Sequence, residues 1–398
     1  MSGNAARVLL SALLQEPWLE ATASELTAQS THLGELLQRA MRVDRAAATA
    51  LLDALWSRAK SDVGWNEPVW REVFVVASVC AAVAAVEHES RDGTVALRRL
   101  DEAFIMGGPA EILQPFVDLV EPLVLQGHDF VVEGASATPE VPNLPTITVA
   151  IPRLQDPTAS QFSDFFRADR PCCMTGEGIA SGWPALRYWK DWGWWTRRYG
   201  HRHVPLEVGA FNDPSWHEEV AAISDFVRRV QGGSEIVYLA QHTLFDQLPG
   251  LREHFREPDV VRGRVTRTNA WMGSANTVTP LHFDSYDGIL TQVVGYKHVR
   301  LFPPSDTRYL YPTSTPWTVQ RRWPTAENEV ADGTTGSEPR GTISLVDIAA
   351  PDVRRFPLFE KAGCVEVVLA PGDAVYIPSG WWHWVRALTQ SISISFVL

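Results

Sequence analysis

The sequence predicts an α+β protein, in which an all-helical N-terminal domain (1–133) precedes a β-rich C-terminal domain (147–398). Three observations support this division. Apolar residues recur at helical spacing up to about residue 133, and the segment 134–146 is rich in proline, glycine and small residues, as linkers are. After it, short β-branched runs alternate with turn signals, a pattern typical of an antiparallel sandwich or barrel.

The helical prediction rests on three segments. VDRAAATALLDALWSRAK (43–60) places an apolar stripe on one face of a helix. PVWREVFVVASVCAAVAAVEHES and TVALRRLDEAFIMGG follow in the same style, and Gly107-Gly108 ends the second of them. The most apolar window, VFVVASVCAAVAAV (73–86), is shorter than the roughly 20 residues of a membrane span. We therefore expect a buried helix there and no membrane segment.

The β-rich part contains seven candidate strand segments: TITVAIP, RHVPLEVG, EIVYLAQ, GILTQVVG, KHVRLFPP, CVEVVLAPGDAVYIP and SISISFVL. Turn signals such as Pro371-Gly372-Asp373 separate them. Helical pieces around 161–168 and 214–231 are expected to pack outside the strands. The polar, turn-rich segment 313–342 is predicted to be an insert or loop.

Composition limits the classes of function. The formal net charge of -12 argues against direct nucleic-acid binding, which needs a basic surface, and is compatible with a basic peptide partner. The four cysteines form no CxxC pair, which favours a reducing, intracellular setting, nuclear or cytoplasmic. We expect the histidines of RYGHRH (198–203) to be solvated rather than to bind a metal.

The stretch TPLHFDSYDGILTQVVGYKHVRLFPP (279–304) carries the chemistry. Residues i and i+2 of a strand point to one face, so His282 and Asp284 can reach one metal ion together. His383, in PSGWWHWVRAL, is the best candidate for a third ligand. Two histidines and one carboxylate leave coordination positions open, as non-haem Fe(II) oxygenases require. The alternative is a pair of core histidines with satisfied hydrogen bonds.

The quoted stretch, extended upstream to NAWMG, and LAPGDAVYIPSGWWHWVRAL together resemble a jumonji-C (JmjC) domain of the cupin-type oxygenases. VPLEVG (204–209) and YLAQHTLFDQLP (238–249) are similar to the group of jumonji domain-containing protein five, also called lysine demethylase eight. The resemblance is strong from about 147 to 398 and weak before. It implies a double-stranded β-helix that uses Fe(II), 2-oxoglutarate and O2.

The resemblance also implies roles for single residues. His282, Asp284 and His383 would be the iron ligands, with no further acid–base residue. Lys297 would pair with the distal carboxylate of 2-oxoglutarate, since a buried dianion needs a buried cation. The co-substrate site would also include Thr279, Tyr238 and Asn269.

Two further residues would face the substrate. Glu207 could hold a guanidinium or ammonium group, and Trp271 could pack over the same cation. Each role has a structural alternative: Lys297 as a hairpin lysine, Glu207 as a surface residue, and Tyr238, Thr279 and Trp271 as ordinary strand or core residues.

Two positions depart from the family pattern. The group usually has asparagine where this chain has Gly288, and tryptophan where it has Val397. Both positions line the co-substrate pocket in the family, so the affinity or pose of 2-oxoglutarate is where this chain is expected to differ.

The function implied is an Fe(II)- and 2-oxoglutarate-dependent oxygenase that hydroxylates a side chain of a basic protein or peptide, with arginine favoured. Three alternatives stay open: a histone N-methyl-lysine demethylase, a small-molecule hydroxylase, and an inactive binding module.

Overall fold

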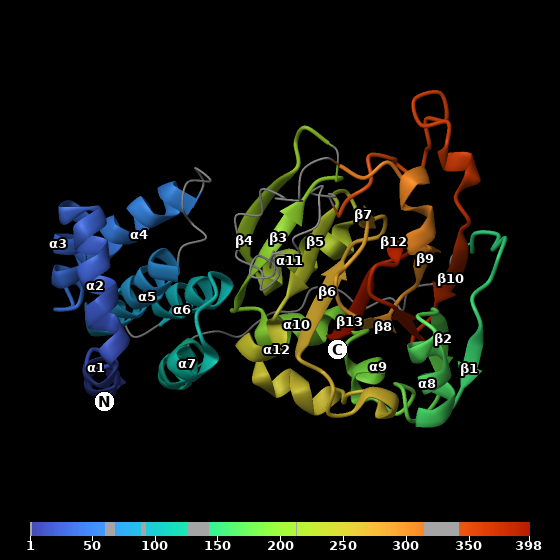
Figure 1. The fold of residues 1–398 in the computed structure, drawn as a ribbon. Helices are drawn as coiled ribbons and strands as arrows, with labels where there is room; N and C mark the ends of the chain where they lie inside the picture. Colours follow the sequence, from blue (N-terminus) through green and yellow to red (C-terminus); the bar gives the residue numbers. More distant parts are fainter. Residues whose placement is uncertain (1, 60–67, 89–92, 126–142, 212, 314–341) are drawn as a thin grey trace.

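The computed structural model describes residues 2–59, 68–88, 93–125, 143–211, 213–313 and 342–398. In this part of the chain a group of helices lies beside a β-barrel with its own covering helices (Figure 1). The α+β class and the cupin-type barrel that the sequence predicts are therefore confirmed. The predicted linker 134–146 lies largely outside the described residues, so the exact domain boundaries stay a prediction.

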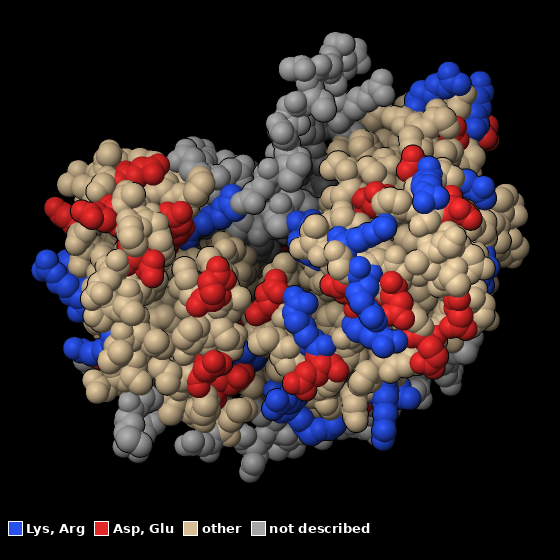
Figure 2. Space-filling view, turned by 60° about the horizontal axis from the view of Figure 1, so that its bottom comes forward, with Lys and Arg blue, Asp and Glu red and all other residues tan. Residues whose placement is uncertain are grey.

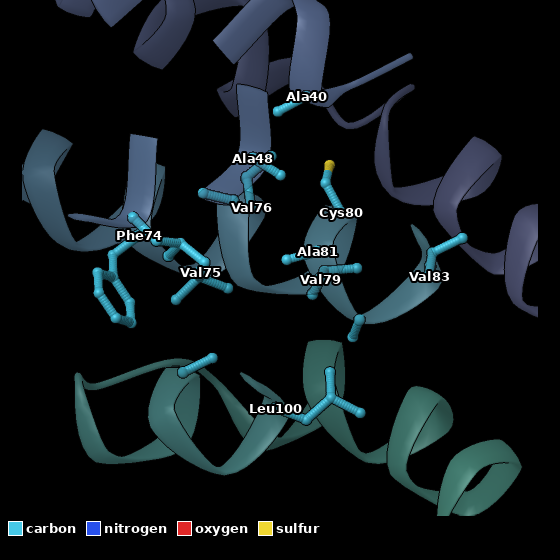
Figure 3. Close-up of a cluster of buried hydrophobic side chains, with 14 of the residues drawn as sticks. Ala40, Ala48, Phe74, Val75, Val76, Val79, Cys80, Ala81, Val83 and Leu100 are labelled. Carbon is cyan, nitrogen blue, oxygen red and sulfur yellow. The ribbon is translucent and has the colours of Figure 1, made fainter. Parts of the chain in front are cut away.

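The N-terminal helices form a bundle around one central helix. They are α1 (Ser2–Leu13), α2 (Pro17–Gln29), α3 (Thr31–Ala40), α4 (Arg45–Ala59), α5 (Pro68–His88), α6 (Thr94–Ile105) and α7 (Ala110–Leu125). In α5 the apolar residues continue around the whole helix, which is the pattern of a helix buried on all sides. Figure 3 shows its valines and Cys80 between Ala40 of α3, Ala48 of α4 and Leu100 of α6.

Helix α5 is long and apolar enough to cross a membrane by length and composition alone, but 83% of the relevant window is buried inside the protein. The expectation of a buried helix at 73–86 is thus confirmed. Helix α6 ends at Ile105, one residue before the glycine pair, and Gly107 adopts a φ of 89° that favours glycine.

The barrel consists of two sheets. The larger has the strand order β1-β2-β11-β8-β13-β6-β5-β3-β4, and the smaller has the order β10-β9-β12-β7. Their bounds are β1 (Arg153–Gln155), β2 (Cys172–Thr175), β3 (His203–Val208), β4 (His217–Ala222), β5 (Val237–His242), β6 (Arg267–Gly273), β7 (Val278–His282), β8 (Gly288–Val294), β9 (Lys297–Phe302), β10 (Val365–Leu369), β11 (Ala374–Ile377), β12 (Trp382–Ala387) and β13 (Ser391–Val397).

Side chains of both sheets meet in a core between them. Leu290 of β8 and Val375 of β11 come from the larger sheet, and Val299 of β9, Val367 of β10 and Val385 of β12 from the smaller. Facing sheets with a shared apolar core form a closed scaffold whose interior is available for a site.

The outer face of the larger sheet is covered by helices: α8 (Ala159–Arg167), α9 (Pro184–Tyr188), α10 (Trp192–Tyr199), α11 (Ile223–Gly232) and α12 (Leu244–Gln247). The tryptophans of segment 182–200 belong to this layer. Trp189, Trp192 and Trp195 are almost completely buried there. Their role is packing.

Three sequence expectations were wrong. TITVAIP forms no strand: within it only Ala150 makes an isolated bridge, to Glu366, and Pro152, which has no amide hydrogen to donate, follows. The segment 214–231 is not helical throughout, since its first half is strand β4, paired with β3 along six residues. The run RYGHRH is not solvated: His201 and Arg202 are buried. The predicted insert 313–342 lies almost entirely outside the described residues.

Candidate metal centre

The candidate metal centre forms where β7 and β12 run side by side in the smaller sheet. His282 ends β7, His383 is the second residue of β12, and the two are direct cross-strand partners. The register of β7 and β12 therefore brings together two residues that are 101 positions apart in the sequence. Side chains that lie opposite each other on one face of an antiparallel pair are close enough to share a ligand.

Asp284 joins them from just beyond the strand. It lies two residues past the end of β7, and its carbonyl oxygen accepts a hydrogen bond of 2.8 Å from the amide of Gly380, in the turn before β12. Between the two candidate ligands, Phe283 points the other way and packs edge-on against Trp382, with ring centroids 4.8 Å apart. The i, i+2 arrangement that the sequence predicts is thus held, although by a loop rather than by the strand itself.

The three side chains point at one another. Nε2 of His282 lies 3.9 Å from Oδ1 of Asp284, and Nε2 of His383 lies 3.6 Å from Oδ2 of the same carboxylate. All three donor atoms fall within 4.8 Å of one another. Since metal–ligand bonds of these types are about 2.0–2.2 Å long, one cation between the atoms can reach all three.

Both histidines present the nitrogen atom Nε2 to the centre of the site. Nδ1 of His282 lies 2.8 Å from the carbonyl oxygen of Pro280, and Nδ1 of His383 lies 3.1 Å from that of Trp381. A carbonyl oxygen only accepts, so each Nδ1 carries the hydrogen and donates it. The lone pair is therefore on Nε2, the atom that faces the centre, and the backbone fixes each ring as partners behind a metal ligand do.

A buried lysine lies in the same pocket. Lys297 begins β9, directly after the turn at Gly295, where φ is 73° and a Cβ would come within 2.1 Å of the Gln390 carbonyl oxygen. Its side chain is 1% exposed, and Nζ lies 5.6 Å from the ring centroid of Tyr238. Burial lowers the pKa of the Lys297 amine from 10.5 to about 7.

In the part of the chain that the structure describes, no carboxylate pairs with Lys297, and burial alone causes its pKa shift. A buried cation is costly unless it is matched. The pocket is therefore arranged for an anionic group that comes from outside the chain.

The metal pocket brings together eight of the nine residues that the sequence singled out. Its lining includes Tyr238, Asn269, Trp271, Thr279, His282, Asp284, Lys297 and His383. Trp271 donates a hydrogen bond of 2.9 Å from Nε1 to Oγ of Ser395, and its ring lies 6.1 Å from that of Tyr238. Asn269 is buried in β6.

Glu207 is the exception. It does not line the metal pocket but a larger neighbouring cavity, in which Gln241 and Asn269 also take part. On β3, Glu207 is paired with Tyr238 of β5 and with Glu218 of β4. It is close to the site, one strand away from the rings that line it.

The residues of the pocket wall that sequence reasoning missed include Gln241 and Tyr286. Gln241 lies at a register shift in β5 and has a φ of 48°, a left-handed conformation that is uncommon for glutamine. Strained residues of this kind cluster at functional sites, but only the backbone reveals them.

Gly288 and Val397 are direct cross-strand partners on β8 and β13, and both line the metal pocket. A Cβ on Gly288 would have only one neighbour within 4 Å, the carbonyl oxygen of Phe396 at 3.8 Å. The pocket therefore has open space at the position where the sequence departs from the JmjC pattern.

Comparisons with known proteins identify the family of the barrel domain. The model of the family described as "Cupin-like domain" matches residues 158–396. Lysine-specific demethylase 8 of Danio rerio is 37% identical over 265 residues, which cover 63% of this chain and 58% of that protein.

Two other relatives match over most of their length. Lysine-specific demethylase JMJ30 of Arabidopsis thaliana is 31% identical over 396 residues, covering 89% of this chain and 86% of that protein. Jumonji C domain-containing protein 5 of Drosophila melanogaster is 30% identical over 365 residues, covering 87% and 85%. The similarity thus extends beyond the barrel into the helical region.

Proposed function

The chain belongs to the cupin-like JmjC family of 2-oxoglutarate-dependent dioxygenases, and from this premise we propose that it uses Fe(II) and O2 to hydroxylate a side chain of a basic protein or peptide, with arginine as the favoured target. We propose an intracellular site of action, nuclear or cytoplasmic. The observation that carries the proposal is the joint presence of three converging metal donors and a buried lysine in one pocket.

His282, Asp284 and His383 would hold the iron. Two imidazole nitrogens and one carboxylate oxygen are the donor set that non-haem Fe(II) takes, and they leave positions open for reactants. When bound, the iron couples the oxidative decarboxylation of 2-oxoglutarate, which gives succinate and CO2, to the insertion of one oxygen atom into a substrate C–H bond.

The other residues of the pocket would bind and orient 2-oxoglutarate. Lys297 would neutralise the distal carboxylate of 2-oxoglutarate, assisted by the hydroxyl groups of Tyr238 and Thr279. The apolar walls, which include Leu290 and Phe396, exclude water and strengthen these charge interactions. No side chain has to remove a proton from the substrate, because the oxidant acts on a C–H bond.

Glu207 supports arginine as the target. A carboxylate binds a guanidinium through two parallel hydrogen bonds, and Glu207 lies on β3 next to Tyr238, at the border of the metal pocket. Demethylation of lysine is the second candidate, since two of the relatives described above are named lysine-specific demethylases and the rings of Tyr238, Trp271 and Tyr286 line the pocket.

The iron assignment is tested by turnover. Purified protein with Fe(II), 2-oxoglutarate and an arginine peptide should form succinate and consume O2, and the variant His282→Ala should abolish both. His32→Ala, an exposed histidine on α3, is the matched control and should behave as wild type. A protein that forms no succinate with any peptide or small molecule would instead be a binding module with an inactive metal centre.

Mass spectrometry of the peptide separates the two chemistries. Hydroxylation of arginine adds one oxygen atom to the peptide, whereas demethylation of methyl-lysine removes one carbon and two hydrogens. We expect the first product. Only the second would overturn the arginine assignment, and turnover of free small molecules but of no peptide would favour a small-molecule hydroxylase.

A further inference from the structure

A second cavity, much larger than the metal pocket, lies between the helical region and the barrel. Its volume is about 510 Å³, against about 70 Å³ for the metal pocket. Arg71 of α5, Phe104 of α6 and Glu111 of α7 line one side, and strands β3 to β6 with α12 line the other. We call this cavity the helix–barrel cleft. Its size is in the range of about 300–1,000 Å³ that ligand sites occupy.

The cleft borders the metal pocket. Gln241 and Asn269 line both, so the two spaces meet at these side chains. Glu207 lines the cleft as well and lies beside Tyr238 of the metal pocket. A chain that lies in the cleft would therefore lie next to the metal pocket.

The two walls of the cleft are fixed to each other by a buried ion pair. Arg202, which precedes β3, donates through Nη2 to Oδ1 of Asp101 on α6 at 2.7 Å and through Nε to the same carboxylate at 3.0 Å. Nη1 also donates to Glu121 of α7, at 3.2 Å. Both Arg202 and Asp101 are almost fully buried. Bidentate pairs of this kind hold a defined geometry.

Further contacts continue this link to the cleft wall. Gln247 of α12 donates to Oδ1 of Asp101 at 2.8 Å, and its own side-chain oxygen accepts from Nε2 of His242 at 2.7 Å. His242 lines the cleft. In addition, Val220 of β4 packs against the core of the helical bundle. Figure 1 shows α6 and α7 on the β3–β4 side of the barrel. These contacts hold the helical region against the barrel, so that it forms the second wall of the cleft.

The charges of the lining indicate what fits. Four carboxylates line the cleft, from Glu111, Glu207, Glu218 and Asp246, against the two guanidinium groups of Arg71 and Arg267. Arg252, outside the lining, also pairs with Asp246 at 2.6 Å, so four carboxylates stand against three guanidinium groups and negative charge remains in excess. The face of the molecule in Figure 2, in contrast, carries acidic and basic residues interspersed. Focused negative charge in a cavity attracts a cationic ligand.

We propose that the helical region is part of the substrate site, and that the helix–barrel cleft binds basic residues flanking the target residue of a peptide substrate. The inference rests on the proposed function, since it names the wall along which the proposed substrate lies. Glu111 and Asp246 become specificity-determining residues, one on each side of the cleft.

The test measures peptide binding, without turnover. The probe is a fluorescein-labelled nine-residue peptide with arginine at the centre and lysines on both sides, followed by fluorescence anisotropy with the full-length chain. Glu111 and Asp246 are both exposed, so Glu111→Lys and Asp246→Lys leave the cores intact. We expect the double variant to weaken binding by about tenfold or more. The control is Glu35→Lys, a single charge reversal of the same kind on the distant helix α3, to be compared with each single variant and with the double variant, and its binding should be as in wild type.

Two results would overturn the inference: no binding of the probe to wild type, or equal weakening by Glu35→Lys and by the double variant. A version of the probe with glutamates in place of the lysines should bind at least tenfold more weakly to wild type, and equal affinity would also overturn it. Failure of the proposed function is a separate observation, the absence of succinate formation by the wild-type protein.

Discussion

Lys297 shows at the scale of a single residue how the pocket is prepared for an anion. Burial lowers the pKa of its amine to about 7, so the folded protein holds fewer protons there than the unfolded chain between about pH 7 and 10.5. The cost of a buried ammonium group is complete below pH 7 and is relieved as the pH rises through that window. A bound carboxylate reverses this preference, because it stabilises the charged amine and raises its pKa.

Binding of 2-oxoglutarate should therefore take up a proton above pH 7, and its affinity should fall by up to about tenfold per pH unit. The measurement is calorimetric titration over pH 6–9 in buffers of different ionisation enthalpy. Lys297→Arg, which stays charged throughout, should remove the pH dependence, and Lys297→Met should weaken binding at every pH. An identical slope in wild type and Lys297→Arg would contradict the assignment.

The residues that sequence could predict are those whose spacing reflects local geometry. The pair His282 and Asp284 was found because strand residues two apart share a face, and the structure brings both to His383. Gln241 could not be found, because a left-handed backbone at a register shift leaves no mark in LAQHT. Glu207 was identified as a residue near the site, but its place in the neighbouring cleft depends on the helical region.

At the scale of elements, local pattern predicted the helices and most strands but not their docking. The run RYGHRH appears solvated because it is polar, yet Asp101 and Glu121, 101 and 81 residues before Arg202, bury it. His201 likewise has Nε2 2.8 Å from Oε1 of Glu121. Burial opposes the ionisation of Glu121, but the hydrogen bonds and charges of His201 and Arg202 outweigh it and lower its pKa. No periodicity reveals a partner so far away.

This docking gives a prediction on stability. Asp101→Ala leaves the Arg202 guanidinium buried without its main partner, and removes acceptors for the His203 amide and for Gln247. We expect the free energy of unfolding to fall by about 3–5 kcal/mol, as when one half of a buried ion pair is deleted. Urea denaturation followed by circular dichroism measures it.

The control for this variant is a surface pair. Arg252 and Asp246 are each about half exposed (47% and 47%), so Arg252→Ala should cost no more than about 1 kcal/mol. If both variants cost the same small amount, the helical region is not held by Asp101.

At the scale of the whole molecule, the net charge of -12 is spread over a surface on which both signs alternate, at least on the face of Figure 2. Long-range attraction of a basic peptide is therefore weak, and the excess carboxylates of the helix–barrel cleft act at short distance. From composition, the net charge of -12 is compatible with a cationic partner. Composition could not place the charge, because the cleft exists only where two regions meet.

The salt dependence of peptide affinity distinguishes attraction by the outer surface of the protein from attraction by the carboxylates of the cleft. The affinity of the lysine-flanked arginine peptide should fall by about tenfold when NaCl is raised from about 0.05 to 0.5 M, because the partly exposed carboxylates of the cleft are screened while the peptide is attracted. The affinity for 2-oxoglutarate should change far less, since Lys297 is buried and screened little. In the double variant Glu111→Lys with Asp246→Lys the salt dependence of peptide binding should shrink, because the charges that salt screens have been reversed. A salt dependence as steep in that variant as in wild type would place the attraction on the outer surface of the protein instead of in the cleft.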